Sequence, residues 1–192
     1  MHIRFVLAAA LVAYSGLSLA GNGYKALPIT QTIQEHSNWC WSASSVATLK
    51  LYGQSPSQCS VANYARSINY ACGNTTFNWN SPANQPAGIY GGSGTIQSIL
   101  LHWGLASTGR ASALSWSSTV SQINANRPFV MRFGWTNGGG HFLVPYGYDD
   151  RSGTQRIGYM NPWPGEGNTW STFSWTVNAS DHRWTHTLTM NR

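Results

Sequence analysis

The stretch QEHSNWCWSASS, residues 34–45, decides how the rest of the chain is interpreted. It places a single cysteine, Cys40, between Trp39 and Trp41. The following run, Ser42–Tyr52, carries apolar residues three apart, and this spacing predicts a helix. A cysteine at the start of a helix lies near the positive end of the helix dipole, which favours the thiolate over the thiol. The stretch therefore predicts a reactive cysteine.

The first twenty residues have the pattern of a secretory signal peptide. Arg4 gives a basic start, Phe5–Ala13 forms an apolar core too short to span a bilayer, and Ser18–Ala20 supplies small residues for a cleavage near Ala20. We therefore expect residues 1–20 to be removed and residues 21–192 to form a single secreted or periplasmic domain. No later apolar run is long enough to cross a membrane.

The composition excludes several classes of protein. Charged residues make up only 8%, whereas there are ten tryptophans and twenty glycines, so the chain is not typical of disordered proteins. The net charge is +6, but the arginines are scattered along the sequence. Because no basic cluster is present, we do not expect nucleic-acid binding.

Three cysteines in an exported chain leave at least one thiol without a partner. Cys59 and Cys72 flank a segment that reads as a helix and a turn, and this spacing allows a disulfide in an oxidising compartment. That pairing leaves Cys40 free. The alternative, a disulfide from Cys40 to one of the other two, would remove the expected chemistry.

The order of the expected elements indicates an α+β fold, with helices in the first half and an antiparallel sheet in the second. The long loop Gly73–Gly94, rich in Asn, Pro and Gly, separates two of the helices. Helices are expected over about 39–52, 60–70, 94–102 and 120–126. Strands are expected over 129–133, 141–148, 156–160, 169–177 and 183–190.

A nucleophilic cysteine needs a base, and His141 is the strongest candidate. It opens a strand directly after three glycines, which permit close backbone approach and leave room for a substrate. Asn161 ends the next strand. Since sequential strands are usually antiparallel neighbours, we expect its amide oxygen to accept the imidazole N–H, with Trp163 covering that bond.

The other histidines have simpler explanations. His36 is expected in a loop near the site, and His102 at a helix end. His182 and His186 are four apart, but no third ligand is evident, so we expect neither a metal site nor a cofactor.

These motifs together resemble the papain-like cysteine proteases. Within them the chain is most similar to the compact bacterial subgroup that includes secreted effector proteases of plant pathogens and bacteriocin-leader peptidases. The resemblance covers roughly residues 31–175 and rests on residues 34–44, 139–150 and 159–167.

The resemblance implies a role for each matching residue. Cys40 would be the nucleophile, His141 the base and acid, and Asn161 the residue that orients the imidazole. Gln34, with the backbone N–H of Cys40, would form the oxyanion hole. Four further residues would support the site: Trp39, Trp41, Trp163 and Gly140.

Alternatives remain for two of these roles. The subgroup often has Asp in the third position, so Asp149 and Asp150 are rivals of Asn161, although Asp suits a turn between strands. Gln31 is a rival of Gln34, three residues farther from the thiol. The chain also lacks the Gly-Ser that precedes the nucleophile of papain.

Three functions fit the sequence. The first is a monomeric secreted peptidase that cleaves proteins or peptides, controlled by a separate inhibitor or immunity protein. The second is an amidase of cell-wall peptides with the same chemistry, which export and basic charge favour. The third is a non-catalytic binding module whose binding face would consist of tryptophans, namely Trp79, Trp116, Trp135, Trp170, Trp175 and Trp184.

Overall fold

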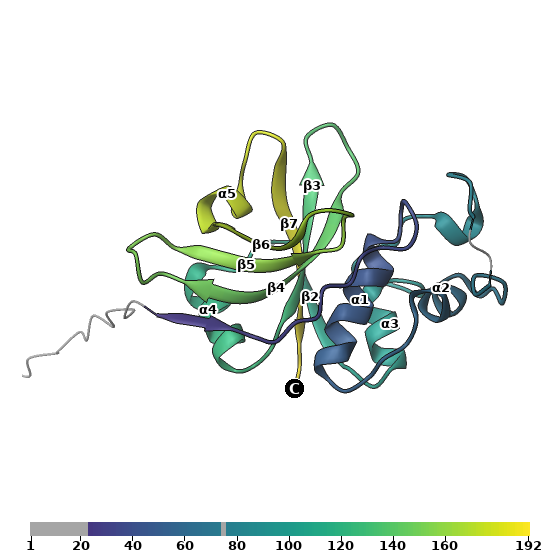
Figure 1. The fold of residues 1–192 in the computed structure, drawn as a ribbon, viewed down its shortest axis with the longest axis horizontal. Helices are drawn as coiled ribbons and strands as arrows, with labels where there is room; N and C mark the ends of the chain where they lie inside the picture. The colour runs from purple at the N-terminus through teal and green to yellow at the C-terminus, as the bar shows by residue number, and fades with distance from the viewer. Residues whose placement is uncertain (1–22, 74–75) are drawn as a thin grey trace, which may run out of the picture.

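A computed structural model describes residues 23–73 and 76–192 (Figure 1). The α-helices are α1 (Cys40–Leu51), α2 (Gln58–Arg66), α3 (Ile96–His102), α4 (Trp116–Asn124) and α5 (Phe173–Val177), with a 3-10 turn at Pro82–Asn84. The strands are β1 (Tyr24–Ala26), β2 (Ser107–Arg110), β3 (Phe129–Trp135), β4 (His141–Asp149), β5 (Arg156–Asn161), β6 (Gly167–Thr172) and β7 (His182–Met190). The predicted signal peptide lies outside the described residues.

The strands form one sheet in the order β2-β7-β3-β4-β5-β6, with β1 also paired to β4. Every pairing is antiparallel. The first residues of β4 pair with β3, and its last residues lie between β1 and β5. Figure 1 shows α1, α2 and α3 together beside this sheet, so the expected helical half and sheet half are confirmed.

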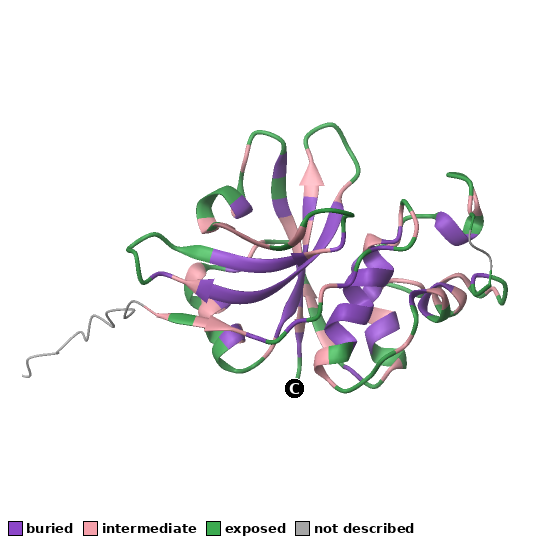
Figure 2. Ribbon diagram, in the orientation of Figure 1, coloured by how far each residue is buried: buried purple, intermediate pink, exposed green. Residues whose placement is uncertain are grey.

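The central helix α1 is buried over nine consecutive residues, Trp41–Leu49, although four of them carry hydroxyl groups. These hydroxyls are satisfied: Ser42 donates to the carbonyl of Gln58 at 3.0 Å and Ser44 to that of Phe142 at 3.1 Å. Ser45 and Thr48 donate to carbonyls one turn back. Because each of these hydroxyls has a partner, a helix with four hydroxyl side chains can be buried almost along its whole length (Figure 2).

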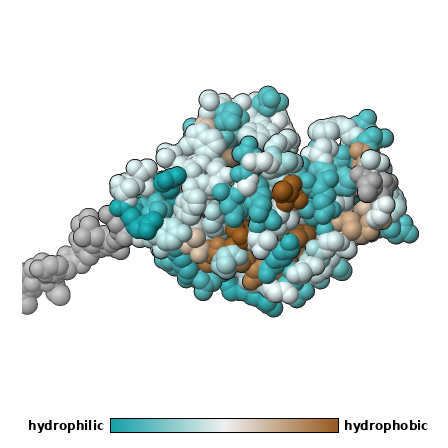
Figure 3. Space-filling model, in the orientation of Figure 1, coloured by the Kyte–Doolittle hydropathy of each residue, from teal (hydrophilic) through white to brown (hydrophobic). Residues whose placement is uncertain are grey.

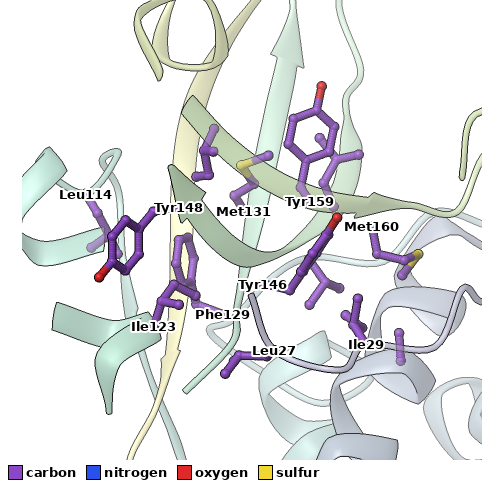
Figure 4. Packing of buried hydrophobic residues seen from close by; sticks show 14 of the residues in the cluster. Leu27, Ile29, Leu114, Ile123, Phe129, Met131, Tyr146, Tyr148, Tyr159 and Met160 are labelled. Atoms are coloured by element: carbon purple, nitrogen blue, oxygen red, sulfur yellow. The ribbon is translucent and has the colours of Figure 1, made fainter. Parts of the chain in front are cut away.

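Two hydrophobic clusters make up the core. The first lies between the sheet and α4, and Figure 4 shows its residues, among them Leu27, Ile29, Phe129, Tyr148 and Met160. The second joins the helices to the sheet and includes Trp39, Trp41, Ile99, Val130 and Phe142. β3 and β4 contribute residues to both clusters, because successive side chains of a strand point to opposite faces of the sheet.

The sequence-based boundaries were wrong in several places. The short edge strands β1 and β2 were not predicted, because three or four residues give little alternation. Residues 173–177 were expected to extend a strand but form α5, since the Thr172 hydroxyl accepts the backbone N–H of Trp175 and caps a helix. The second helix starts at Gln58 after the Ser57 cap and stops at Ser67, whose φ of 52° is left-handed.

The described helices contain no segment long and apolar enough to cross a bilayer. On the face shown in Figure 3, most of the surface is hydrophilic or intermediate in hydropathy, with only small hydrophobic patches.

Candidate active site

Cys40 is the first residue of α1 and is held from both sides by buried tryptophans. Trp39 and Trp41 have no exposed surface, and the indole N–H of Trp39 donates to the carbonyl of Ala83 at 2.8 Å. The guanidinium of Arg66 lies over the ring of Trp41, 4.8 Å from its centroid. These contacts fix the start of the helix, and therefore the position of Cys40, a residue of intermediate exposure.

The cysteine faces the first residues of β4. The backbone N–H of Phe142 bonds to the Cys40 sulfur. Phe142 directly follows His141, so the register of α1 on β4 brings the thiol and the imidazole to one place. His141 and Cys40 both line the same cavity.

His141 and Asn161 lie together as the antiparallel pairing predicts. His141 Nε2 lies 2.8 Å from Asn161 Oδ1, and the same oxygen accepts the backbone N–H of Trp163 at 3.0 Å. Because a backbone N–H needs an acceptor, the Trp163 contact assigns oxygen rather than nitrogen to this side of the amide. The partner of that oxygen, His141 Nε2, must then carry a hydrogen, which leaves Nδ1 as the proton acceptor.

Two further tryptophans hold the imidazole plane. The ring of Trp135 stacks on His141 at 6.3 Å between centroids, with an interplanar angle of 17°. Trp163 meets His141 edge to face at 5.8 Å and is 50% exposed. Trp163 therefore covers the imidazole from one side only.

The glycine turn before His141 is required by its backbone and its neighbours. Gly138 and Gly139 have φ of 95° and 79°, which non-glycine residues rarely adopt. A Cβ at Gly140 would lie 2.5 Å from the carbonyl oxygen of Phe133 and 2.6 Å from Arg132 Cζ. The turn thus brings the backbone close to β3 and lets the Arg132 guanidinium lie against it.

Burial shifts both titratable partners towards their neutral forms. It raises the pKa of the Cys40 thiol to about 11, against the opposing effects of backbone N–H groups and of the Arg132 charge. Burial also lowers the pKa of His141, against the hydrogen bond to Asn161 and the charge of Glu166. The N–H groups of Cys40 and Trp41 at the helix start do favour the thiolate, as expected, but burial outweighs them, so the net shift is towards the neutral thiol.

Gln34 is placed differently from its expected role. Its Nε2 donates to the carbonyls of His36 at 2.9 Å and Ser37 at 2.8 Å, and it does not line the cavity. Its Oε1 is buried and has no hydrogen-bond partner among the described residues. Gln31 donates instead to the backbone carbonyl of Asn161 at 2.8 Å. It therefore helps to hold the backbone of Asn161 in place.

The rival carboxylates lie at the other end of β4. Asp149 is eight residues from His141 along the strand, which is about 26 Å at the usual rise. Its hydrogen bonds and ion pair with Arg151 hold its pKa down at about 2. The carboxylate of Asp150 accepts the backbone N–H of Gly23. Neither is near the imidazole.

The remaining predicted residues lie outside the cleft. Cys59 and Cys72 form the expected disulfide, which leaves Cys40, inside the cleft, as the free cysteine. His102 ends α3 and stacks on Tyr64. Among residues 23–73 and 76–192, no group of three His, Cys, Asp or Glu side chains is placed to hold a metal ion.

The cavity around the thiol has a volume of about 710 Å³, and its lining includes four tryptophans, one phenylalanine, one cation and one anion. The sequence indicated no role for several of its residues, since they belong to different strands and loops. The lining comprises Ser37, Asn38, Cys40, Trp41, Trp79, Pro86, Ala87, Arg132, Trp135, Gly138, Gly139, Gly140, His141, Phe142, Asn161, Trp163 and Glu166.

Comparison of the fold with solved structures finds several similar chains, two of which are described here. One is the peptidase domain of Streptococcus ComA, a bi-functional ABC transporter involved in a quorum sensing pathway, with a TM-score of 0.56 and 13% identity over 85% of this chain and 99% of that one. The other is from work on antibody cross-reactivity between the mite allergens Blo t 1 and Der p 1, with a TM-score of 0.51 and 14% identity over 95% and 74%. At identities of 13% and 14%, the similarity shows a shared fold and nothing more.

Sequence comparison gives the family directly. No curated protein matches the chain. The family model described as Peptidase_C39 like family matches residues 26–188, which include both halves of the fold and every residue of the cleft. The chain therefore belongs to the Peptidase_C39 like family and is a papain-like cysteine peptidase.

Proposed function

We propose that the protein is a secreted peptidase that cleaves peptide bonds of protein substrates through Cys40, His141 and Asn161. The observation that carries the proposal is the 2.8 Å contact between His141 Nε2 and Asn161 Oδ1, which leaves Nδ1 unprotonated in the cavity that also contains Cys40. A neutral imidazole with a free Nδ1 is the base that a thiol of raised pKa requires.

The reaction proceeds in two halves. In the first, the Cys40 sulfur attacks the scissile carbonyl carbon while Nδ1 of His141 takes the thiol proton. The imidazolium then gives that proton to the departing amine, and the acyl group remains on the sulfur as a thioester. In the second, Nδ1 takes a proton from water, the resulting hydroxide attacks the thioester, and the Cys40 thiol leaves with the proton.

The negative charge on the carbonyl oxygen needs donors. The backbone N–H of Cys40 at the start of α1 is one. We propose Gln34 as the second, which requires its amide to release one of the two backbone carbonyls that it now binds. If Gln34→Ala kept full activity, another group would have to be the second donor to the oxyanion.

The tryptophans do not support a separate binding module. Trp184 is 3% exposed, and Trp116 and Trp170 pack against the core. Of the six candidates, Trp135 and Trp79 line the catalytic cavity itself. We therefore assign these two to substrate contact.

Labelling tests the proposal. The purified protein is treated with an epoxysuccinyl inhibitor and the modified peptide is identified by mass spectrometry, while casein and purified peptidoglycan are digested in parallel. Labelling at Cys40 together with casein cleavage supports the proposal. Release of peptide fragments from peptidoglycan without casein cleavage supports the cell-wall amidase. An unlabelled Cys40 contradicts both the peptidase and the amidase.

Secretion is tested separately. The exported protein is isolated and its N-terminus is sequenced. We expect it to begin just after Ala20, as a signal peptidase site there requires. A protein retained with residues 1–20 attached would contradict secretion by this route.

A further inference from the structure

The catalytic cavity is lined by one cation and one anion, Arg132 and Glu166. In a chain with only 8% charged residues, both signs at one cleft are notable. Arg132 lies on β3 and Glu166 in the turn between β5 and β6. Because β4, with His141 as its first residue, runs between β3 and β5, the two charges lie on opposite sides of the base.

Arg132 is held in place by an irregularity of the sheet. The register of β3 against β7 shifts between Arg132 and Phe133, so Thr185 is an extra residue on β7. The Thr185 hydroxyl accepts from Arg132 Nη1 at 3.1 Å and donates to the Arg132 carbonyl at 3.3 Å. Nη2 donates to the Gly139 carbonyl at 2.6 Å. A bulge commonly re-aims a side chain near an active site, and here it fixes the guanidinium beside the glycine turn.

Both charges act on the catalytic pair and lack a charged partner. The Arg132 charge acts on the Cys40 thiol, and the Glu166 charge acts on His141. The ion pairs in the described part of the chain are Arg151 with Asp149 and His182 with Asp181, so neither cavity charge is neutralised there. Several guanidinium N–H groups of Arg132 remain after its two hydrogen bonds.

An unpaired charge in an open cleft is solvated by water. A bound peptide expels that water, and a peptide without a matching group leaves the charge desolvated and unpaired. The cleft therefore discriminates between peptides by where their charges fall, in addition to selecting apolar side chains against its tryptophans.

We propose that Arg132 and Glu166 are specificity-determining residues that select peptides with a carboxylate on the β3 side of the scissile bond and a cationic group on the β5–β6 side. This inference rests on the proposed peptidase function and deepens it by naming the charge pattern of the substrate. The carboxylate is either an acidic side chain or the C-terminus of the peptide, and the test separates these sources.

The test uses two blocked fluorogenic peptides of identical composition. Each has an N-terminal acetyl and a C-terminal amide, and each carries one Asp and one Lys on opposite sides of the scissile bond, in opposite orders. Because their net charges are equal, attraction to the basic protein as a whole is the same for both. The measured quantity is the ratio of kcat/KM between the two orders.

We expect one order to be cleaved about tenfold better, which is typical of partly screened charge pairs with charge-assisted hydrogen bonds. Replacing the Asp by Asn in the preferred peptide should lower kcat/KM about threefold in the wild type, because one of two charge pairs is lost, but should change it little in Arg132→Gln. Replacing the Lys by Gln should likewise lower kcat/KM about threefold in the wild type but change it little in Glu166→Gln. Arg183→Gln is the matched control, since Arg183 is exposed on β7 and does not line the cavity.

A third peptide with a free C-terminus in place of the Asp side chain distinguishes the sources of the carboxylate. Faster cleavage of this peptide than of the blocked one, lost in Arg132→Gln, assigns Arg132 to the terminal carboxylate. Faster cleavage of the blocked peptide assigns it to an acidic side chain.

Affinity measured on Cys40→Ala by tryptophan fluorescence keeps the test independent of turnover. Equal kcat/KM and equal affinity for the two orders, or a preference that is undiminished in both Arg132→Gln and Glu166→Gln, would overturn the inference while leaving the peptidase function standing. Failure of the proposed function looks different: Cys40 stays unlabelled and no peptide is cleaved, whatever its charge order.

Discussion

The two sides of the cleft are built by different means. On the helical side, the sulfur of Cys40 is placed by a buried helix start, with Trp39 and Trp41 completely enclosed. On the sheet side, His141 is placed by strand register, and its ring is oriented by Asn161 and by the partly exposed Trp163. Position on the first side thus depends on core packing, whereas orientation on the second depends on a few side-chain contacts.

This difference predicts how substitutions divide between stability and activity. Changes around Cys40, other than in the thiol itself, should destabilise the fold. Changes around His141 should leave the fold intact and reduce the rate.

The largest effect is expected for the thiol itself. Cys40→Ala should reduce kcat/KM on a peptide substrate by at least about 10⁴-fold, because no other group supplies the nucleophile. The melting temperature should change little, since only one sulfur atom is lost. The measurement is the initial rate of peptide cleavage beside a thermal melt. Residual cleavage within tenfold of the wild type would show that another residue is the nucleophile.

The next largest effect is a difference in stability between variants of Trp39, on the helical side, and Trp163, on the sheet side. Trp39→Ala should lower the free energy of unfolding by about 3–5 kcal/mol, because it removes a fully buried ring. Trp163→Ala should lower it by less than about 1 kcal/mol, since half of that ring is exposed. Chemical denaturation of both variants gives the two values. Equal losses would contradict the division between the two sides.

A smaller effect is expected for the residue that orients the base. Asn161→Ala should reduce kcat by about ten- to a hundredfold, because the neutral imidazole loses the partner that selects its tautomer. Asp149→Asn is the matched control and should retain wild-type kcat, since Asp149 is at the far end of β4. If Asp149→Asn were as impaired as Asn161→Ala, the third position would have to be reassigned.

The smallest effect is a displacement of the pH profile. Catalysis needs neutral His141, and burial lowers its pKa, so kcat/KM should stay high down to a pH below 6.5 and fall only as pH drops through that lowered value. Asn161→Asp places a carboxylate beside the imidazole, which stabilises the imidazolium, so the acidic limb should move to higher pH. An acidic limb above 6.5 in the wild type, or a downward shift in Asn161→Asp, would contradict this electrostatic account.

Much of this arrangement was predictable from local sequence. The glycine turn and the apolar, aromatic-rich run after it indicate β4, and the antiparallel pairing of sequential strands brings Asn161 to His141. The rest depends on long-range structure. Arg132 belongs to the cleft because of a bulge between β3 and β7, strands about fifty residues apart in sequence. The raised pKa of Cys40 follows from burial, which the helix pattern does not reveal.

Gln34 shows another limit of sequence reasoning. Its distance from Cys40 in the chain suggests an oxyanion donor, but the direction of its amide is set by the carbonyls of His36 and Ser37. The spacing along the chain predicts that Gln34 lies close to Cys40, but its hydrogen bonds determine the direction of its side-chain amide.

The acyl-enzyme is the most direct test of the central claim, that Cys40 attacks the substrate with His141 as its base. The protein is mixed with a slowly deacylating ester substrate, quenched in acid within milliseconds to seconds, and analysed by intact-mass and peptide mass spectrometry. The account predicts a mass increase equal to the acyl group, located on the peptide that contains Cys40, which forms much more slowly in His141→Ala. Absence of any adduct during turnover, or an adduct on another residue, would contradict it.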